Sequence, residues 1–110
     1  MASSVQNLLH GFDGRSELRS GLGEMQQAFR ESGRYMDAFR VGKILRKKKL
    51  FEKLYTQTMQ QAAADLLASP RSSEFGDGEF GKWLIEWFSD GGWEIIIEFI
   101  KALLPLFGLI

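Results

Sequence analysis

The chain of 110 residues has no cysteine, one histidine (His10) and two prolines. Without cysteine it forms no disulfide, no thiolate metal site and no catalytic thiol. One histidine is too few for a multi-histidine zinc or iron site within a single chain. No motif identifies a reaction, a metal site or a cofactor, so the sequence favours a protein that is not an enzyme and carries no cofactor.

A net charge is missing as well, because fourteen basic residues balance fourteen acidic ones. This balance argues against a globally basic coat for nucleic acid and against an acidic disordered tail. The two signs are nevertheless separated along the chain. Residues 30–53 hold nine basic and three acidic residues, a net charge of +6, whereas residues 54–110 hold three basic and eight acidic residues, a net charge of −5. A chain polarised in this way can meet two different surfaces.

The first part of the chain has the patterns of helices. Residues 1–14 predict a short helix and a turn, and no secretory signal, because no long apolar run follows the start. Residues 15–68 predict amphipathic helices, with Gly33 as either a kink or a junction between two helices. One apolar stripe continues across Gly33 and consists of Leu22, Met25, Phe29, Ser32, Met36 and Phe39. A second stripe consists of Ile44, Phe51, Tyr55, Met59, Ala62 and Leu66.

The last part of the chain differs in kind. Residues 69–81 are rich in Ser and Gly and predict a linker. Residues 82–110 predict one or two hydrophobic helices, with a hairpin over 80–110 as one arrangement. We therefore expect an all-α fold of elongated amphipathic helices whose apolar stripes are buried by partners, together with a hydrophobic C-terminal helix.

The strongest functional signal is the run of eighteen residues from Trp93 to Ile110, of which only five are not hydrophobic. A helix of this length is about 27 Å long, close to the hydrocarbon thickness of a bilayer. Tryptophan is also typical of membrane interfaces. We therefore predict that this helix spans the bilayer or lies in its interface. The predicted membrane-contacting residues are Trp83, Trp87, Trp93, Ile96, Ile97, Ile100, Leu103, Leu104 and Phe107. The alternative is a helix packed between subunits, with the charged stripe of Glu94, Glu98 and Lys101 facing water.

The second signal is the basic run over residues 43–53, which includes four successive basic residues from Arg46 to Lys49. Such a cluster can neutralise the phosphates of lipid headgroups or of nucleic acid. No base-reading module accompanies it, so nucleic acid is the weaker expectation. The predicted headgroup- or partner-binding residues are Lys43, Arg46, Lys47, Lys49 and Lys53. The alternative is a solvated helix face that pairs with the acidic half of a neighbouring chain.

Together these signals predict a non-enzymatic, membrane-associated structural protein of a larger assembly, such as a minor structural component of a virion or phage. The expected location is a membrane, including a virion membrane. The expected partners are a lipid bilayer and further subunits of the same or another kind. One alternative is a soluble helical scaffold whose C-terminal helix is buried between subunits. Another is a membrane-disrupting amphipathic protein.

Overall fold

The computed structural model describes residues 9–69, 79–106 and 108 of the chain. Every regular element in these ranges is helical, which confirms the all-α fold class. The elements are α2 (Arg15–Glu31), α3 (Tyr35–Arg46), α4 (Lys48–Ala68), α5 (Phe80–Trp87), the short segment η2 (Phe88–Gly92) and α6 (Trp93–Leu106). The predicted helix over 1–14 and the predicted linker over 69–81 lie mostly outside the described residues, and α5 begins inside the range predicted as linker.

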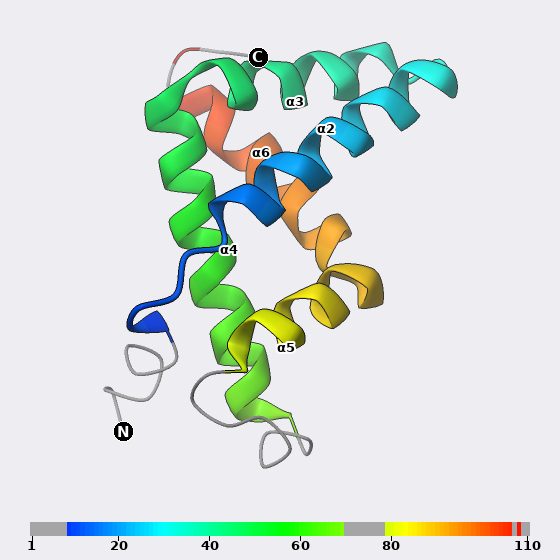
Figure 1. The fold of residues 1–110 in the computed structure, drawn as a ribbon. Coiled ribbons are helices and arrows are strands. Elements are labelled where there is room, and N and C mark those ends of the chain that lie inside the picture. The colour runs from blue at the N-terminus through cyan, green and yellow to red at the C-terminus, as the bar shows by residue number, and fades with distance from the viewer. Residues whose placement is uncertain (1–8, 70–78, 107, 109–110) are drawn as a thin grey trace.

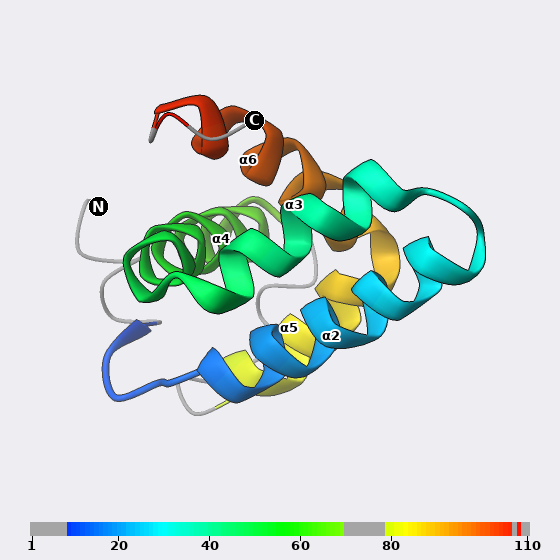
Figure 2. The ribbon, with the colours of Figure 1, turned by 90° about the horizontal axis from the view of Figure 1, so that it is seen from above.

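Helix α4 is the centre of the arrangement (Figure 1). Helix α3 meets its N-terminal end at a sharp corner, α5 packs against its C-terminal half, and α6 lies alongside it. Helices α2 and α3 lie side by side as an antiparallel pair, as both ribbon views show (Figures 1 and 2). The two ends of α4 therefore carry different elements: α3 at one end and α5 at the other.

The pair of α2 and α3 forms because α2 ends at Gly33. This glycine has a φ of +80°, a left-handed conformation that side chains with a Cβ rarely adopt. The N–H of Arg34 donates to the carbonyl of Phe29 (2.8 Å) and the N–H of Gly33 donates to that of Arg30 (3.2 Å), the two bonds of a Schellman C-cap. Gly33 is thus a junction between two helices and not a kink within one.

A second boundary separates α3 from α4 at Lys47, where the sequence contains neither glycine nor proline. The backbone of Lys47 is extended, with φ −110° and ψ 105°, so the chain turns between two helices. The stripe from Ile44 to Leu66 therefore belongs to two helices. Its members are nevertheless all buried, because both helices turn this side toward the same core.

The core is built from the chain's own helices. Leu18 and Leu22 of α2, Leu54 of α4 and Ile96 and Leu104 of α6 are all fully buried. The described part of the molecule measures 41 × 27 × 20 Å. The chain is thus less extended than we predicted, because its apolar stripes pack against one another and are already buried without a partner.

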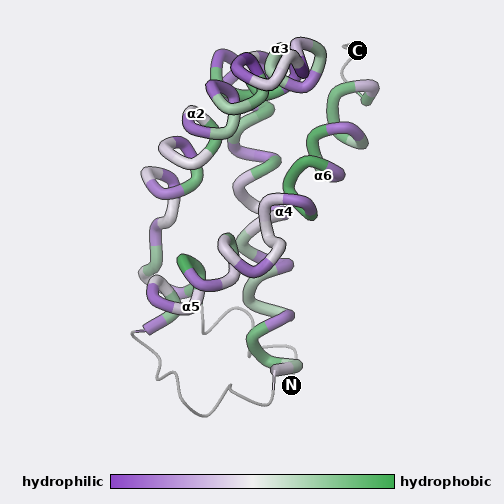
Figure 3. Tube along the Cα trace, turned by 90° about the vertical axis from the view of Figure 1, so that its right-hand side faces the viewer, coloured by the Kyte–Doolittle hydropathy of each residue, from purple (hydrophilic) through white to green (hydrophobic). Residues whose placement is uncertain are grey.

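The C-terminal helices are joined by a kink and not by a hairpin loop. Gly91, with a φ of +97°, redirects the chain between α5 and α6. Helix α6 has 14 residues and lies alongside α4 (Figure 3). Among residues 9–69 and 79–106, no helix combines the length and the apolar character needed to cross a bilayer.

Candidate functional site

Most of the side chains predicted to contact a membrane lie inside the folded chain. Five of them are at most 6% exposed: Trp87, Ile96, Ile100, Leu103 and Leu104. Trp83, Trp93 and Ile97 are partly buried, and Phe107 lies outside the described side chains. The fold therefore covers five side chains that we predicted to face lipid. The physical reason is that the apolar face of α6 is matched by the apolar faces of α4 and α3.

The three tryptophans connect helices. The indole N–H of Trp83 donates to the carbonyl of Ala62 (2.9 Å), and that of Trp87 donates to the carboxylate of Asp65 (2.7 Å), so both anchor α5 to α4. The ring of Trp93 stacks on that of Phe88 with centroids 4.5 Å apart. These polar and stacking contacts explain the tryptophans without a membrane interface.

Trp93 also fixes the distance between α2 and α6. A Cβ added at Gly21 would overlap the indole ring of Trp93, so only glycine fits at this position of α2. By contrast, a Cβ at Gly23, two residues further along α2, would meet nothing within 4 Å. The close approach at Gly21 is therefore a specific feature of the packing of α2 against α6.

The predicted basic residues gather at the turn between α3 and α4. Arg46, Lys47, Lys48 and Lys49 are all exposed, and we call them the basic corner. Within the described part of the chain, none of these four side chains forms an ion pair. Lys43 is partly buried and places its ammonium 5.1 Å from the centroid of the Phe39 ring, and Lys53 is exposed one turn further along α4.

Two residues of the basic corner, Lys48 and Lys49, also stand at an unfavourable place in α4, whereas Arg46 lies in the last turn of α3, where a positive charge is favourable. The first turn of α4 contains no acidic residue, and no side chain caps its N-terminus. The N-terminal end of a helix carries a partial positive charge, so basic residues there raise the free energy of the fold. An anion bound at this corner would relieve both sources of positive potential.

Next to the basic corner, α3 exposes large apolar side chains. Tyr35 is 70%, Met36 is 51% and Phe39 is 41% exposed. At 100° per residue these three fall within about 100° of one another, in the same arc as Lys43 and Arg46. We call this surface the α3 outer face: Tyr35, Met36, Phe39, Lys43 and Arg46. Among the described residues, the other exposed large apolar side chains are Leu67, Ile85 and Leu106, which stand on three different helices.

The prediction that Met36 and Phe39 share an apolar stripe with Leu22 was wrong, because both side chains are exposed on α3. We placed them on the apolar stripe that begins at Leu22, which requires one continuous helical face. Because the chain reverses at Gly33, residues after it cannot continue the face of α2. In α3 the buried side is formed by Ala38, Val41 and Ile44, and Met36 and Phe39 turn outward. The spacing of Tyr35, Phe39 and Lys43 at four-residue steps is the signal that could have revealed this face.

Among the described residues, each carboxylate with a shifted pKa is hydrogen-bonded by an arginine. The pKa of Asp37 is raised by partial burial, but the hydrogen bonds and charges of Arg34 and Arg40 outweigh this and leave it below its ordinary value. A hydrogen-bonded pair with Arg15, as close as 2.7 Å, lowers the pKa of Glu52 and joins α2 to α4. Such pairs keep carboxylates ionised and stabilise helix contacts, so they do not provide a proton donor or acceptor near pH 7.

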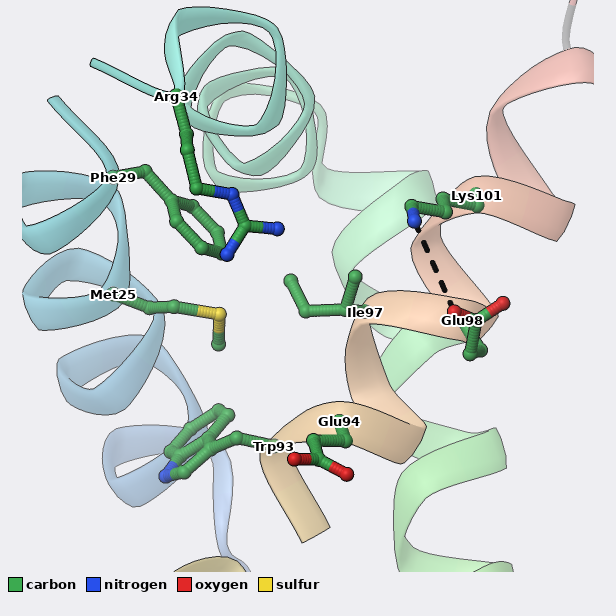
Figure 4. Close-up of a pocket in the computed structure, with 8 residues that line it drawn as sticks. All are labelled: Met25, Phe29, Arg34, Trp93, Glu94, Ile97, Glu98 and Lys101. Carbon is green, nitrogen blue, oxygen red and sulfur yellow. Dashed lines mark ion pairs between the residues drawn. The ribbon is translucent and has the colours of Figure 1, made fainter. Parts of the chain in front are cut away.

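Two surface clefts border α6. The first, of about 480 Å³, lies between α2 and α6 and has mixed charge, with Arg34, Glu94, Glu98 and Lys101 around an apolar floor (Figure 4). Glu98 and Lys101 form an ion pair across 3.8 Å on its rim. The second is also about 480 Å³ and lies between α2 and the α5–η2 segment. We call it the acidic groove, lined by Ser16, Glu17, Ser20, Gly21, Glu24, Ile85, Phe88, Ser89 and Trp93.

No group of three or more metal-binding side chains is present among residues 9–69 and 79–106. The described residues offer charged and apolar surfaces. Compared with models of protein families, with curated proteins and with solved structures, the chain matches none of them.

Proposed function

We propose that the protein is a non-enzymatic, membrane-associated component of a larger assembly, and that it docks on the surface of an anionic bilayer through the α3 outer face and the basic corner. The observation that carries this proposal is the joint exposure of Tyr35, Met36 and Phe39 beside the four exposed side chains of the basic corner, none of which forms an ion pair with another described residue.

Two physical contributions support the docking. Each Lys or Arg near an anionic surface contributes about 1 kcal/mol, and this attraction falls off within a Debye length. Apolar side chains that enter the headgroup region add a contribution that salt does not screen. One weak signal gives only marginal membrane binding, whereas two signals together give stable binding. The α3 outer face and the basic corner provide both signals on adjacent surfaces.

The distribution of acidic residues is compatible with this orientation. Helix α5 packs on the C-terminal half of α4, away from the corner that α3 forms with its N-terminus. Glu79, Glu86 and Asp90 lie at or next to α5. A molecule that places α3 on an anionic bilayer thus keeps these carboxylates away from it, which avoids a repulsive contribution.

The test is co-sedimentation of the full chain with vesicles of phosphatidylcholine alone or mixed with phosphatidylserine. We expect binding to the anionic vesicles only. The variant Lys47→Glu/Lys48→Glu/Lys49→Glu should lose it, because the corner becomes acidic. The variant Met36→Ser/Phe39→Ser should still be attracted to anionic vesicles in a salt-dependent way, because its basic corner is intact. Its affinity for them should fall at least tenfold, a loss of 1.4 kcal/mol or more.

Leu67→Ser is the matched control, since Leu67 is exposed to the same degree as Phe39 but lies on α4. It should bind like the unaltered chain. No binding to anionic vesicles would reject the proposal. Binding to nucleic acid with none to vesicles would assign the basic corner to the other class of polyanion.

A further inference from the structure

We infer that the acidic groove binds the α3–α4 corner of a second copy of this chain, so that copies associate head to tail. This inference goes beyond membrane docking and does not rest on it. The occupant is a second copy because the same chain carries a surface of opposite charge with matching apolar side chains.

The groove has one sign of charge. Among the described residues that line it, the charged side chains are Glu17 and Glu24, both exposed on α2. They are seven positions apart in the sequence, which corresponds to about 10 Å along a helix. The other cleft beside α6 differs, because its carboxylates share the rim with Arg34 and Lys101.

The groove also has an apolar side. Ile85 on α5 is 60% exposed, and the groove includes the stacked rings of Phe88 and Trp93. Because Trp93 packs on Gly21, α2 is held at a fixed position beside this stack. The groove is shallow and its backbone is already in place, so binding orders mainly the exposed side chains of Glu17, Glu24 and Ile85.

The complementary surface is the α3 outer face together with the basic corner. Phe39 and Met36 offer apolar area for Ile85, and Lys43 with the corner residues offers cations for Glu17 and Glu24. The chain's own α3 does not occupy the groove. Gln26 faces α3 by donating to the carbonyl of Ala38 (3.2 Å), and Glu24 lies about 160° around α2 from it.

The contact joins two different surfaces of the same chain, so it leaves one of each free at the ends of any oligomer. Such heterologous contacts form rings or open chains and not closed two-fold dimers. The α3 outer face would then be covered in the oligomer, so a second copy and an anionic bilayer compete for it.

The first experiment is sedimentation velocity of the full chain without lipid over a range of concentrations. We expect the average mass to rise beyond that of a dimer at low salt. Near 1 M salt, where the Debye length is about 3 Å, the association should weaken strongly. A chain that stays monomeric at every concentration and salt would overturn the inference and leave the membrane proposal untouched.

The second experiment reverses charge on each surface. The corner variant Lys47→Glu/Lys48→Glu/Lys49→Glu and the groove variant Glu17→Lys/Glu24→Lys should each stay monomeric. An equimolar mixture should associate again, because the acidic groove of the first meets the basic corner of the second. The control Glu31→Lys/Glu98→Lys has the same net charge as the groove variant and should associate like the unaltered chain, since Glu31 and Glu98 lie outside the groove.

The third experiment removes apolar area without changing charge. Ile85→Ser should raise the apparent Kd about tenfold, whereas Leu67→Ser should leave it unchanged. Circular dichroism confirms that each variant is folded. Equal association of these two variants, or a charge-reversed mixture that stays monomeric while the unaltered chain associates, would contradict the docking of copies in this groove.

Discussion

Helices α6 and α3 are the two regions whose comparison explains this molecule. Helix α6 is the richer in aliphatic residues, yet Ile96, Ile100 and Leu104 are at most 1% exposed. Helix α3 has fewer apolar residues, yet Tyr35 is 70% exposed. The amount of apolar side chain in a segment therefore does not decide what meets solvent or lipid. The presence of a matching face in the same chain decides it.

This difference has a local cause in each helix. The apolar residues of α6 recur at spacings of three and four, and Glu94, Glu98 and Lys101 lie on the other side, so α6 is an amphipathic helix that fits a core. Helix α3 buries Ala38, Val41 and Ile44, and no other described helix covers its outer side. The outer face that remains combines apolar and basic side chains.

The largest effect should separate a buried residue of α6 from an exposed residue of α3. Ile100→Ala should lower the free energy of unfolding by about 2–5 kcal/mol, because it removes a side chain from the core and leaves a cavity. Phe39→Ala should lower it less, by about 1 kcal/mol, because 41% of the residue is already exposed to solvent. Urea unfolding of both variants measures this. Similar losses for the two variants would mean that α6 is not part of the core.

A smaller effect tests how closely α2 approaches α6. Gly21→Ala should destabilise the fold by about 1–3 kcal/mol, since the added methyl overlaps the ring of Trp93. Gly23→Ala is the matched control. It should stabilise the fold by about 0.4–1 kcal/mol, because a solvent-facing helical glycine is replaced by a better helix former. Thermal unfolding of the pair gives the two signs directly, and equal signs would contradict the contact.

The smallest predicted effect is a change in how the stability of the fold depends on pH. Because Arg15 lowers the pKa of Glu52 in the folded chain, protons bind more tightly to the unfolded state. The pair therefore stabilises the fold above the ordinary pKa of 4.5, and this stabilisation is lost as the pH falls through the lower folded value. Glu52→Gln should reduce stability at pH 7 and flatten its decline in acid. An unchanged pH profile would show that the pair does not join α2 to α4 in solution.

The sequence was sufficient for the fold class and for most of the buried stripes. Spacing predicts Ile44, Phe51, Tyr55, Met59, Ala62 and Leu66 as one apolar set, and all are buried. It could not predict the boundary at Lys47, because no glycine or proline marks it and the extended backbone there depends on how α3 and α4 pack.

The candidate site was predicted only in its charged half. Successive basic residues are exposed almost regardless of fold, because their burial without partners is too costly. The apolar half depends on which side of α3 faces α2. One continuous helical stripe from Leu22 to Phe39 and two separate faces on α2 and α3 would show the same spacing of apolar residues in the sequence. Only the Schellman hydrogen bonds at Gly33 distinguish these two arrangements.

The most direct test uses the absence of cysteine, since one introduced cysteine is the only thiol in the chain. We would label Phe39→Cys and, separately, Leu67→Cys with a polarity-sensitive fluorophore. Both native side chains are exposed, one on α3 and one near the C-terminal end of α4, the end away from α3. With anionic vesicles, emission from position 39 should shift to shorter wavelength, as expected on entry into lipid, and emission from position 67 should stay as in water. A shift at position 67 without one at position 39 would contradict docking through α3.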